Sequence, residues 1–215
     1  MNSKKKTQQI DREHKEFVDN LHKLLQGDTK IASKPLLIGE LPNIFYKCNK
    51  LNEINITERT KLIILKKTID KIMRPEILDS DGKRTKKSGH FLTEKQIIEV
   101  INELKYPSII FNGSIKESLV AVTNLKDNKE HNIIVSLLFN KQQGTQQITE
   151  ITSIYGKELI QNYIKNNIEN NNVVAIHKEK AKEMLLTIGV DFPEANTFIS
   201  FDDSIAYTEL SVNNK

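Results

Sequence analysis

The sequence predicts an α+β domain in which helices come first, a short antiparallel meander follows, and further helices close the domain. Three observations support this class. Apolar residues recur about every three to four positions in the first part of the chain, β-branched and apolar runs dominate the middle, and helical periodicity returns after Gly156. Segments in this order are typical of α+β domains. The 215 residues are enough for one domain with an appendage.

An amphipathic helix is expected near the amino terminus. Apolar residues recur at helical spacing over residues 10–25, and Gly27 follows where a C-cap glycine is common. The stretch 28–34 is mostly polar. Residues 1–34 are therefore expected to form an amphipathic helix and linker, with the main domain over residues 35–193.

Two further helices are expected before the sheet. One covers residues 58–73, with Thr57 as its N-cap, apolar residues on one side and basic residues on the other. The second follows Thr93 and Gln96, which form the S/T-x-x-E/Q signature of a capping box. The polar, lysine-rich stretch between these two helices predicts a loop.

Four strands are expected to form one antiparallel sheet. They cover residues 108–111, 119–125, 132–139 and 148–154. The fourth also fits a helical turn, because its apolar residues fall three apart. Helices are expected to follow over residues 159–168 and 178–188, and an acidic tail over residues 194–215.

Composition excludes several classes of function. The single cysteine, Cys48, cannot close an intramolecular disulfide, and no set of Cys and His has zinc-ligand spacing. The longest nearly apolar run, residues 133–139, is far shorter than the roughly 20 residues of a membrane span. The P-loop, G-x-S-x-G and H-E-x-x-H motifs are absent. Asp202 and Asp203 are adjacent acids that suit Mg²⁺, but such a tail is usually solvated. We expect a soluble protein made in a reducing compartment, with no metal site.

Positive charge is concentrated in residues 59–88. This segment has ten basic residues and four acids, whereas residues 191–209 have five acids and no base. Basic side chains that displace counterions bind phosphates with salt-dependent affinity, so the segment suits a nucleic acid. A solvated helix face followed by a mobile loop explains the same pattern equally well.

Two places in the chain are suited to chemistry. His90 follows the basic segment and precedes a predicted helix N-terminus, which favours a neutral imidazole and attracts an anion. In residues 151–157, Ser153, Tyr155 and Lys157 surround Gly156 with donors and charge that suit a phosphate. The alternatives are a loop histidine bonded to backbone, and a simple strand-to-helix break with Tyr155 in the core.

These residues resemble the MuF-type carboxy-terminal toxin domains of phage head proteins and polymorphic toxins, which are grouped with barnase, EndoU, colicin and RelE-like nucleases. The resemblance extends over residues 35–193. The segments that carry it are 37–42, 70–73, 90–93, 106–111, 151–157 and 176–181. The string T-S-I-Y-G-K is the most specific of them.

The resemblance implies a barnase/EndoU/RelE-like fold and a metal-independent endoribonuclease that needs no cofactor. The ribose 2′-OH would attack the adjacent phosphodiester. The residues it assigns to catalysis are His90, Tyr155, Lys157, Ser153 and Lys71. The residues expected to bind the RNA backbone are Arg74, Lys83, Arg84, Lys86 and Lys87. The sequence departs from the family at Phe91, where the family usually has glycine after the histidine.

The implied partners are RNA and, for a toxin, a dedicated immunity or inhibitor protein. The implied location is the cytoplasm, or the cytoplasm of a target cell reached with phage or secretion machinery. Two other functions remain open from the sequence. One is a non-catalytic phage or toxin-associated module that binds nucleic acid or a partner, and the other is an enzyme of the same fold that acts on another nucleotide substrate.

Overall fold

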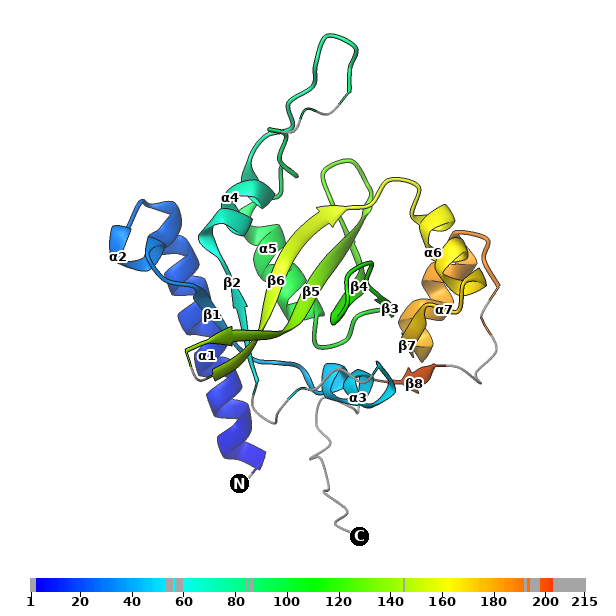
Figure 1. Cartoon of the computed structure of the whole chain (residues 1–215), viewed down its shortest axis with the longest axis horizontal. Helices are drawn as coiled ribbons and strands as arrows, with labels where there is room; N and C mark the ends of the chain where they lie inside the picture. Colours follow the sequence, from blue (N-terminus) through cyan, green and yellow to red (C-terminus); the bar gives the residue numbers. More distant parts are fainter. Residues whose placement is uncertain are drawn as a thin grey trace.

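The computed structural model describes residues 3–52, 56, 60–83, 85, 87–144, 146–191, 193 and 198–202. Within these residues, one mixed sheet of eight strands forms the centre of the molecule (Figure 1), in the order β1-β2-β6-β5-β4-β3-β7-β8. The strands are β1 (Leu36–Glu40), β2 (Lys61–Ile64), β3 (Ile109–Asn112), β4 (Ser118–Lys126), β5 (Asn132–Gln143), β6 (Gln146–Gly156), β7 (Val173–His177) and β8 (Ile199–Phe201). Neighbouring strands are antiparallel except for the parallel pairs β2–β6 and β7–β8.

Helices cover both faces of this sheet. They are α1 (Ser3–Leu25), α2 (Thr29–Ala32), α3 (Asn43–Asn52), α4 (Lys66–Met73), α5 (Glu94–Glu103), α6 (Ile160–Glu169) and α7 (Lys178–Thr187). In Figure 1, α5 lies behind β5 and β6, whereas α6 and α7 lie together beside β7. The larger core cluster joins α1, α3, α4 and α5 to one face, and a smaller one joins α6 and α7 to the other.

The amino-terminal helix is part of the larger core. Phe17 and Leu21 of α1 are fully buried within it. On the polar side, the Glu13 carboxylate accepts hydrogen bonds from the Glu40 amide at 3.2 Å and from Lys61 Nζ at 3.1 Å. Apolar burial and polar anchors together therefore hold α1 against β1 and β2.

The class is α+β, but the predicted four-stranded antiparallel sheet is wrong. The four predicted strands correspond to β3, β4, β5 and β6, and four more strands extend the sheet on both sides. The additional strands are three to five residues long, so their period of two is too brief to stand out in the sequence. The barnase/EndoU/RelE-like architecture implied by the resemblance depended on the smaller sheet and is corrected with it.

The helix predicted over residues 58–73 is wrong in its first half. Residues 61–64 form β2, and α4 begins only after Leu65, whose backbone is extended. Leu62, Ile63 and Ile64 are consecutive and all buried. A continuous apolar run is typical of a strand covered on both faces, and periodicity alone does not separate it from a buried helix. Thr57 and residues 58–59 lie outside the described residues.

The predicted capping box is confirmed. The Gln96 amide donates to Thr93 Oγ1, while the Gln96 side chain accepts from the Thr93 amide. Between residues 194 and 215, the structure describes residues 198–202, which contain β8; Asp203 lies outside them. In the described part of the chain, no helix has the length and apolar character needed to cross a membrane.

Candidate active site

The parallel pairing of β2 with β6 places α4 beside the end of β6. Parallel strands have their carboxyl ends at one edge of a sheet, and only Leu65 separates the end of β2 from the start of α4. Its apolar residues Ile69 and Ile72 are fully buried in the larger core. The carboxyl end of α4 therefore lies near the end of β6, where Tyr155 is located.

The chain then returns along the carboxyl end of α4 and brings His90 with it. The amides of residues 89, 90, 91 and 92 donate to the carbonyl oxygens of residues 75, 71, 74 and 72, at 3.0 to 3.2 Å. Helix C-termini leave carbonyl groups without intrahelical partners, and this segment supplies donors for them. Gly89 permits the approach, because a Cβ there would lie 2.0 Å from the Arg74 carbonyl oxygen.

His90 and Tyr155, predicted from separate parts of the sequence, are in contact. Their rings are stacked with centroids 5.1 Å apart and planes 25° apart. Both residues are half-buried, and both imidazole nitrogens of His90 are buried. Because the polar atoms of stacked rings are at their edges, the stacking itself does not use the imidazole nitrogens or the phenol oxygen.

Lys157 lies over the ring of Tyr163, which is close to Tyr155. Tyr163 was not predicted from the sequence as a site residue. Lys157 Nζ lies 4.9 Å from the centroid of the Tyr163 ring on α6. Burial raises the pKa of Tyr163 to about 12; the nearby Tyr155 phenol adds to this, while a hydrogen bond with Asn167 opposes it. Burial also raises the pKa of Tyr155. Both phenols are therefore protonated near neutral pH, and no sequence motif marks Tyr163.

Ser153 lies on the same face of β6 as Tyr155. The two residues pair with Ser136 and Ile134 of β5 without an intervening bulge, so their side chains point to one side of the sheet. Ser153 is half-buried. The structure thus brings His90, Tyr155, Lys157 and Ser153 to one end of β6.

The β4–β5 turn supports this end of β6. Asp127 is buried, and a Cβ on Gly156 would lie 1.9 Å from its Oδ2 atom, so any larger residue at position 156 would displace the Asp127 side chain. Asp127 Oδ1 accepts from the amides of Lys129 and His131, and His131 Nδ1 lies 3.4 Å from Asp127 Oδ2. The sequence suggested a phosphate beside Gly156, and the close neighbour in the structure is this carboxylate.

Apart from Lys157, the basic residues predicted to act on or bind RNA are exposed wherever the structure describes them. Lys71 is exposed, and its backbone carbonyl accepts the His90 amide at 3.2 Å, so the two residues are neighbours. Arg74 is exposed and donates from Nη1 to the Lys87 carbonyl oxygen at 3.3 Å. Lys83 and Lys87 are exposed, whereas Arg84 and Lys86 lie outside the described residues.

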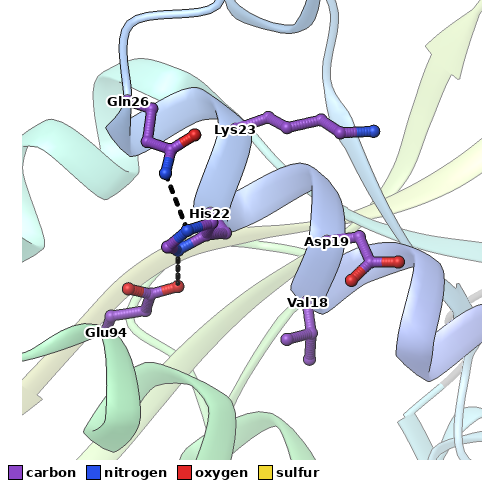
Figure 2. Close-up of a pocket in the computed structure, with 6 residues that line it drawn as sticks. All are labelled: Val18, Asp19, His22, Lys23, Gln26 and Glu94. Carbon is purple, nitrogen blue, oxygen red and sulfur yellow. Dashed lines mark hydrogen bonds and ion pairs between the residues drawn. The ribbon is translucent and has the colours of Figure 1, made fainter.

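A separate hollow of about 460 Å³ lies between α1 and the start of α5. Figure 2 shows His22 between two partners there: Nε2 lies 2.8 Å from Gln26 Nε2, and Nδ1 lies 3.4 Å from Glu94 Oε1. Both nitrogens of this histidine are thus engaged within the protein, and none of the predicted site residues lines the hollow. We therefore locate the candidate site at His90 and Tyr155.

Two other kinds of group could carry chemistry, a cluster of metal ligands and the thiol of Cys48. In the part of the chain that the structure describes, no three His, Cys, Asp or Glu side chains are grouped to hold a metal ion. Cys48 is buried, and burial raises the pKa of its thiol to about 12. Such a thiol stays protonated at neutral pH and is a poor nucleophile.

Residues 81–183 match the family model of the phage MuF C-terminal domain. The match covers just under half of the chain and includes His90, Tyr155 and Lys157, whereas Lys71 and Arg74 precede it. It supports a MuF-type domain and a connection with phage. No curated protein matches the chain, and no solved structure does.

Proposed function

We propose that this chain is an endoribonuclease that cleaves RNA by attack of the ribose 2′-OH on the adjacent phosphodiester, without a metal ion. The observation that carries the proposal is the stack of His90 on Tyr155 at 5.1 Å. Lys157 lies two residues further along the chain. The reaction needs one group to take a proton, one to donate a proton and a cation near the phosphate, and these three residues are of the required types.

His90 takes the proton from the 2′-OH, and Tyr155 donates a proton to the departing 5′-oxygen. A raised phenol pKa suits a donor, because the group keeps its proton at neutral pH. General acid and general base catalysis each contribute about 10²- to 10⁴-fold in rate. Lys157 stabilises the negative charge that develops on the phosphorane, Ser153 donates to a phosphate oxygen, and Lys71 adds positive charge beside His90.

RNA reaches His90 only after its surroundings adjust, because both imidazole nitrogens are buried. Sites of this kind often complete their hydrogen bonds only when the substrate is bound. We further propose that the protein acts as a toxin in the cytoplasm of a producing or target cell. A dedicated inhibitor protein is then expected to accompany it.

The test uses the full chain and labelled RNA in the presence of EDTA. We expect the wild type to cleave RNA, and His90→Ala to lose cleavage at least 10²-fold with little change in its thermal melt. His22→Ala is the matched control, since His22 lies in the separate hollow, and it should cleave like the wild type. DNA of the same sequence should stay intact because it lacks the 2′-OH.

Two outcomes would contradict the proposal. Equal cleavage by His90→Ala and the wild type would remove His90 from the mechanism. Salt-sensitive binding of RNA that stays intact would instead favour the non-catalytic binding module, because phosphate contacts alone give that salt dependence.

A further inference from the structure

Phe91, the residue after His90, combines an unfavourable backbone with an exposed ring. Its φ is +55°, in the left-handed region that favours glycine. Its side chain is 57% exposed, and it belongs to neither core cluster. The ring is too exposed for its burial to offset the free-energy cost of this backbone conformation. The described residues include five other non-glycine positions with positive φ, so the conformation matters here because it presents an exposed ring directly after His90.

The backbone of Phe91 is fixed from both sides. Its amide donates to the Arg74 carbonyl oxygen at 3.1 Å, and its carbonyl oxygen accepts from Asn128 Nδ2 at 2.9 Å. The Asn128 side chain also accepts from Gln96 Nε2 at 3.2 Å. The ring is thus carried by a segment anchored to α4, to α5 and to the β4–β5 turn.

The surroundings of this ring suit a polyanion. Lys71 and Arg74 are exposed at the carboxyl end of α4, whose carbonyl groups accept the amides of His90 and Phe91. Lys87 is exposed in the loop that leads to His90. Proteins bind single-stranded nucleic acid with exposed aromatic rings beside basic segments, because bases stack on the ring while phosphates meet the charges, and Phe91 lies on a segment bonded to such a helix end.

We propose that Phe91 is the platform on which an unpaired nucleobase of the substrate stacks, next to the bond that is cleaved. This inference rests on the proposed function and deepens it, since it assigns the substrate to single-stranded RNA. Duplex RNA offers no free base face at this position. Phe91 is a binding residue in this scheme and takes no part in proton transfer.

The chain contains no tryptophan, which allows a direct test. Phe91→Trp places a single indole at the platform, and a single-stranded 2′-O-methyl oligonucleotide should quench its fluorescence because the base stacks on it. The control is Ile115→Trp, because Ile115 is 65% exposed in the turn before β4, at the opposite end of that strand from Asn128. No quenching of Phe91→Trp, or equal quenching of both variants, would overturn the proposal.

A second measurement separates the ring from the backbone. Phe91→Gly keeps the backbone conformation and removes the ring, so the KM for single-stranded RNA should rise about 5- to 150-fold, the equivalent of one stacked base, while kcat changes less. Glu117→Gly, which relaxes a φ of +60° in the β3–β4 turn, should leave KM unchanged.

The two proposals fail in different ways. If the wild type cleaves RNA and Phe91→Gly has the wild-type KM, the platform is excluded and the ribonuclease stands. If neither the wild type nor any variant cleaves RNA but the single-stranded oligonucleotide quenches Phe91→Trp alone, base stacking on Phe91 stands and the ribonuclease is excluded. Equal binding of an abasic and a base-containing oligonucleotide would show that phosphate charge alone accounts for binding, and it would also exclude the platform.

Discussion

Gly89 sets how closely the His90 segment approaches α4, and Gly89→Ala should separate them. The new Cβ would lie 2.0 Å from the Arg74 carbonyl oxygen and 2.5 Å from Arg74 Cβ. The first clash is with backbone, so the segment 89–92 must move and weaken its four backbone hydrogen bonds. At about 1 kcal/mol each, less about 0.5–1 kcal/mol from the lower entropy of the unfolded chain, the net loss is about 3 kcal/mol.

The free energy of unfolding is measured by urea denaturation followed by circular dichroism. The control is Gly82→Ala in the same connection, where a Cβ meets nothing within 4 Å but φ is +74°, so the expected cost is about 1 kcal/mol. Gly89→Ala should also reduce RNA cleavage, because His90 moves away from Tyr155. The reasoning is refuted if Gly89→Ala unfolds at the same urea concentration as Gly82→Ala or at a higher one.

Two further predictions test α1 and the tyrosine cluster. Phe17→Ala should lower the free energy of unfolding by about 3–5 kcal/mol because Phe17 is fully buried, whereas Leu25→Ala, at a position 40% exposed, should cost under about 1 kcal/mol in the same urea titration; equal effects would contradict the docking of α1. The raised pKa of Tyr163 contributes stability that is complete below pH 10 and is lost as pH rises from 10 to about 12, because only the unfolded phenol ionises in that range. Unfolding at several pH values should therefore show a shallower alkaline decline for Tyr163→Phe, and an unchanged slope would argue against the burial of this phenol.

The central part of the fold was predictable because its signals are local. The capping box at Thr93 and the long β-branched runs of β4 and β5 each identify an element without reference to the rest of the chain. The outer strands were not predictable in this way. Val173–His177 is buried at every position, and such a run has no alternation to distinguish it from a helical segment. Its pairing with β3 and β8 depends on tertiary contacts.

The candidate site was predictable by residue type but not by geometry. An imidazole after a basic segment, and a phenol and an ammonium around a glycine, are recognisable in a sequence. Tyr163 and Asp127 carry no such signal, since each acts through contacts with Lys157 and Gly156 that only the fold creates. Gly156 illustrates the limit: the side chains around it suggested a phosphate, whereas the group that lies closest to it is the Asp127 carboxylate.

The strand β2, which was not predicted from the sequence, positions the residues of the candidate site. If residues 58–73 were one helix, nothing would fix the carboxyl end of α4 beside β6. Because Lys61–Ile64 instead pairs in parallel with residues 148–151 of β6, α4 starts at the edge toward which β6 runs. Residues 89–92, whose amides bond to the carboxyl end of α4, therefore lie near Tyr155, and they include His90. A substitution that weakens β2 should therefore separate His90 from Tyr155 even though it touches neither residue.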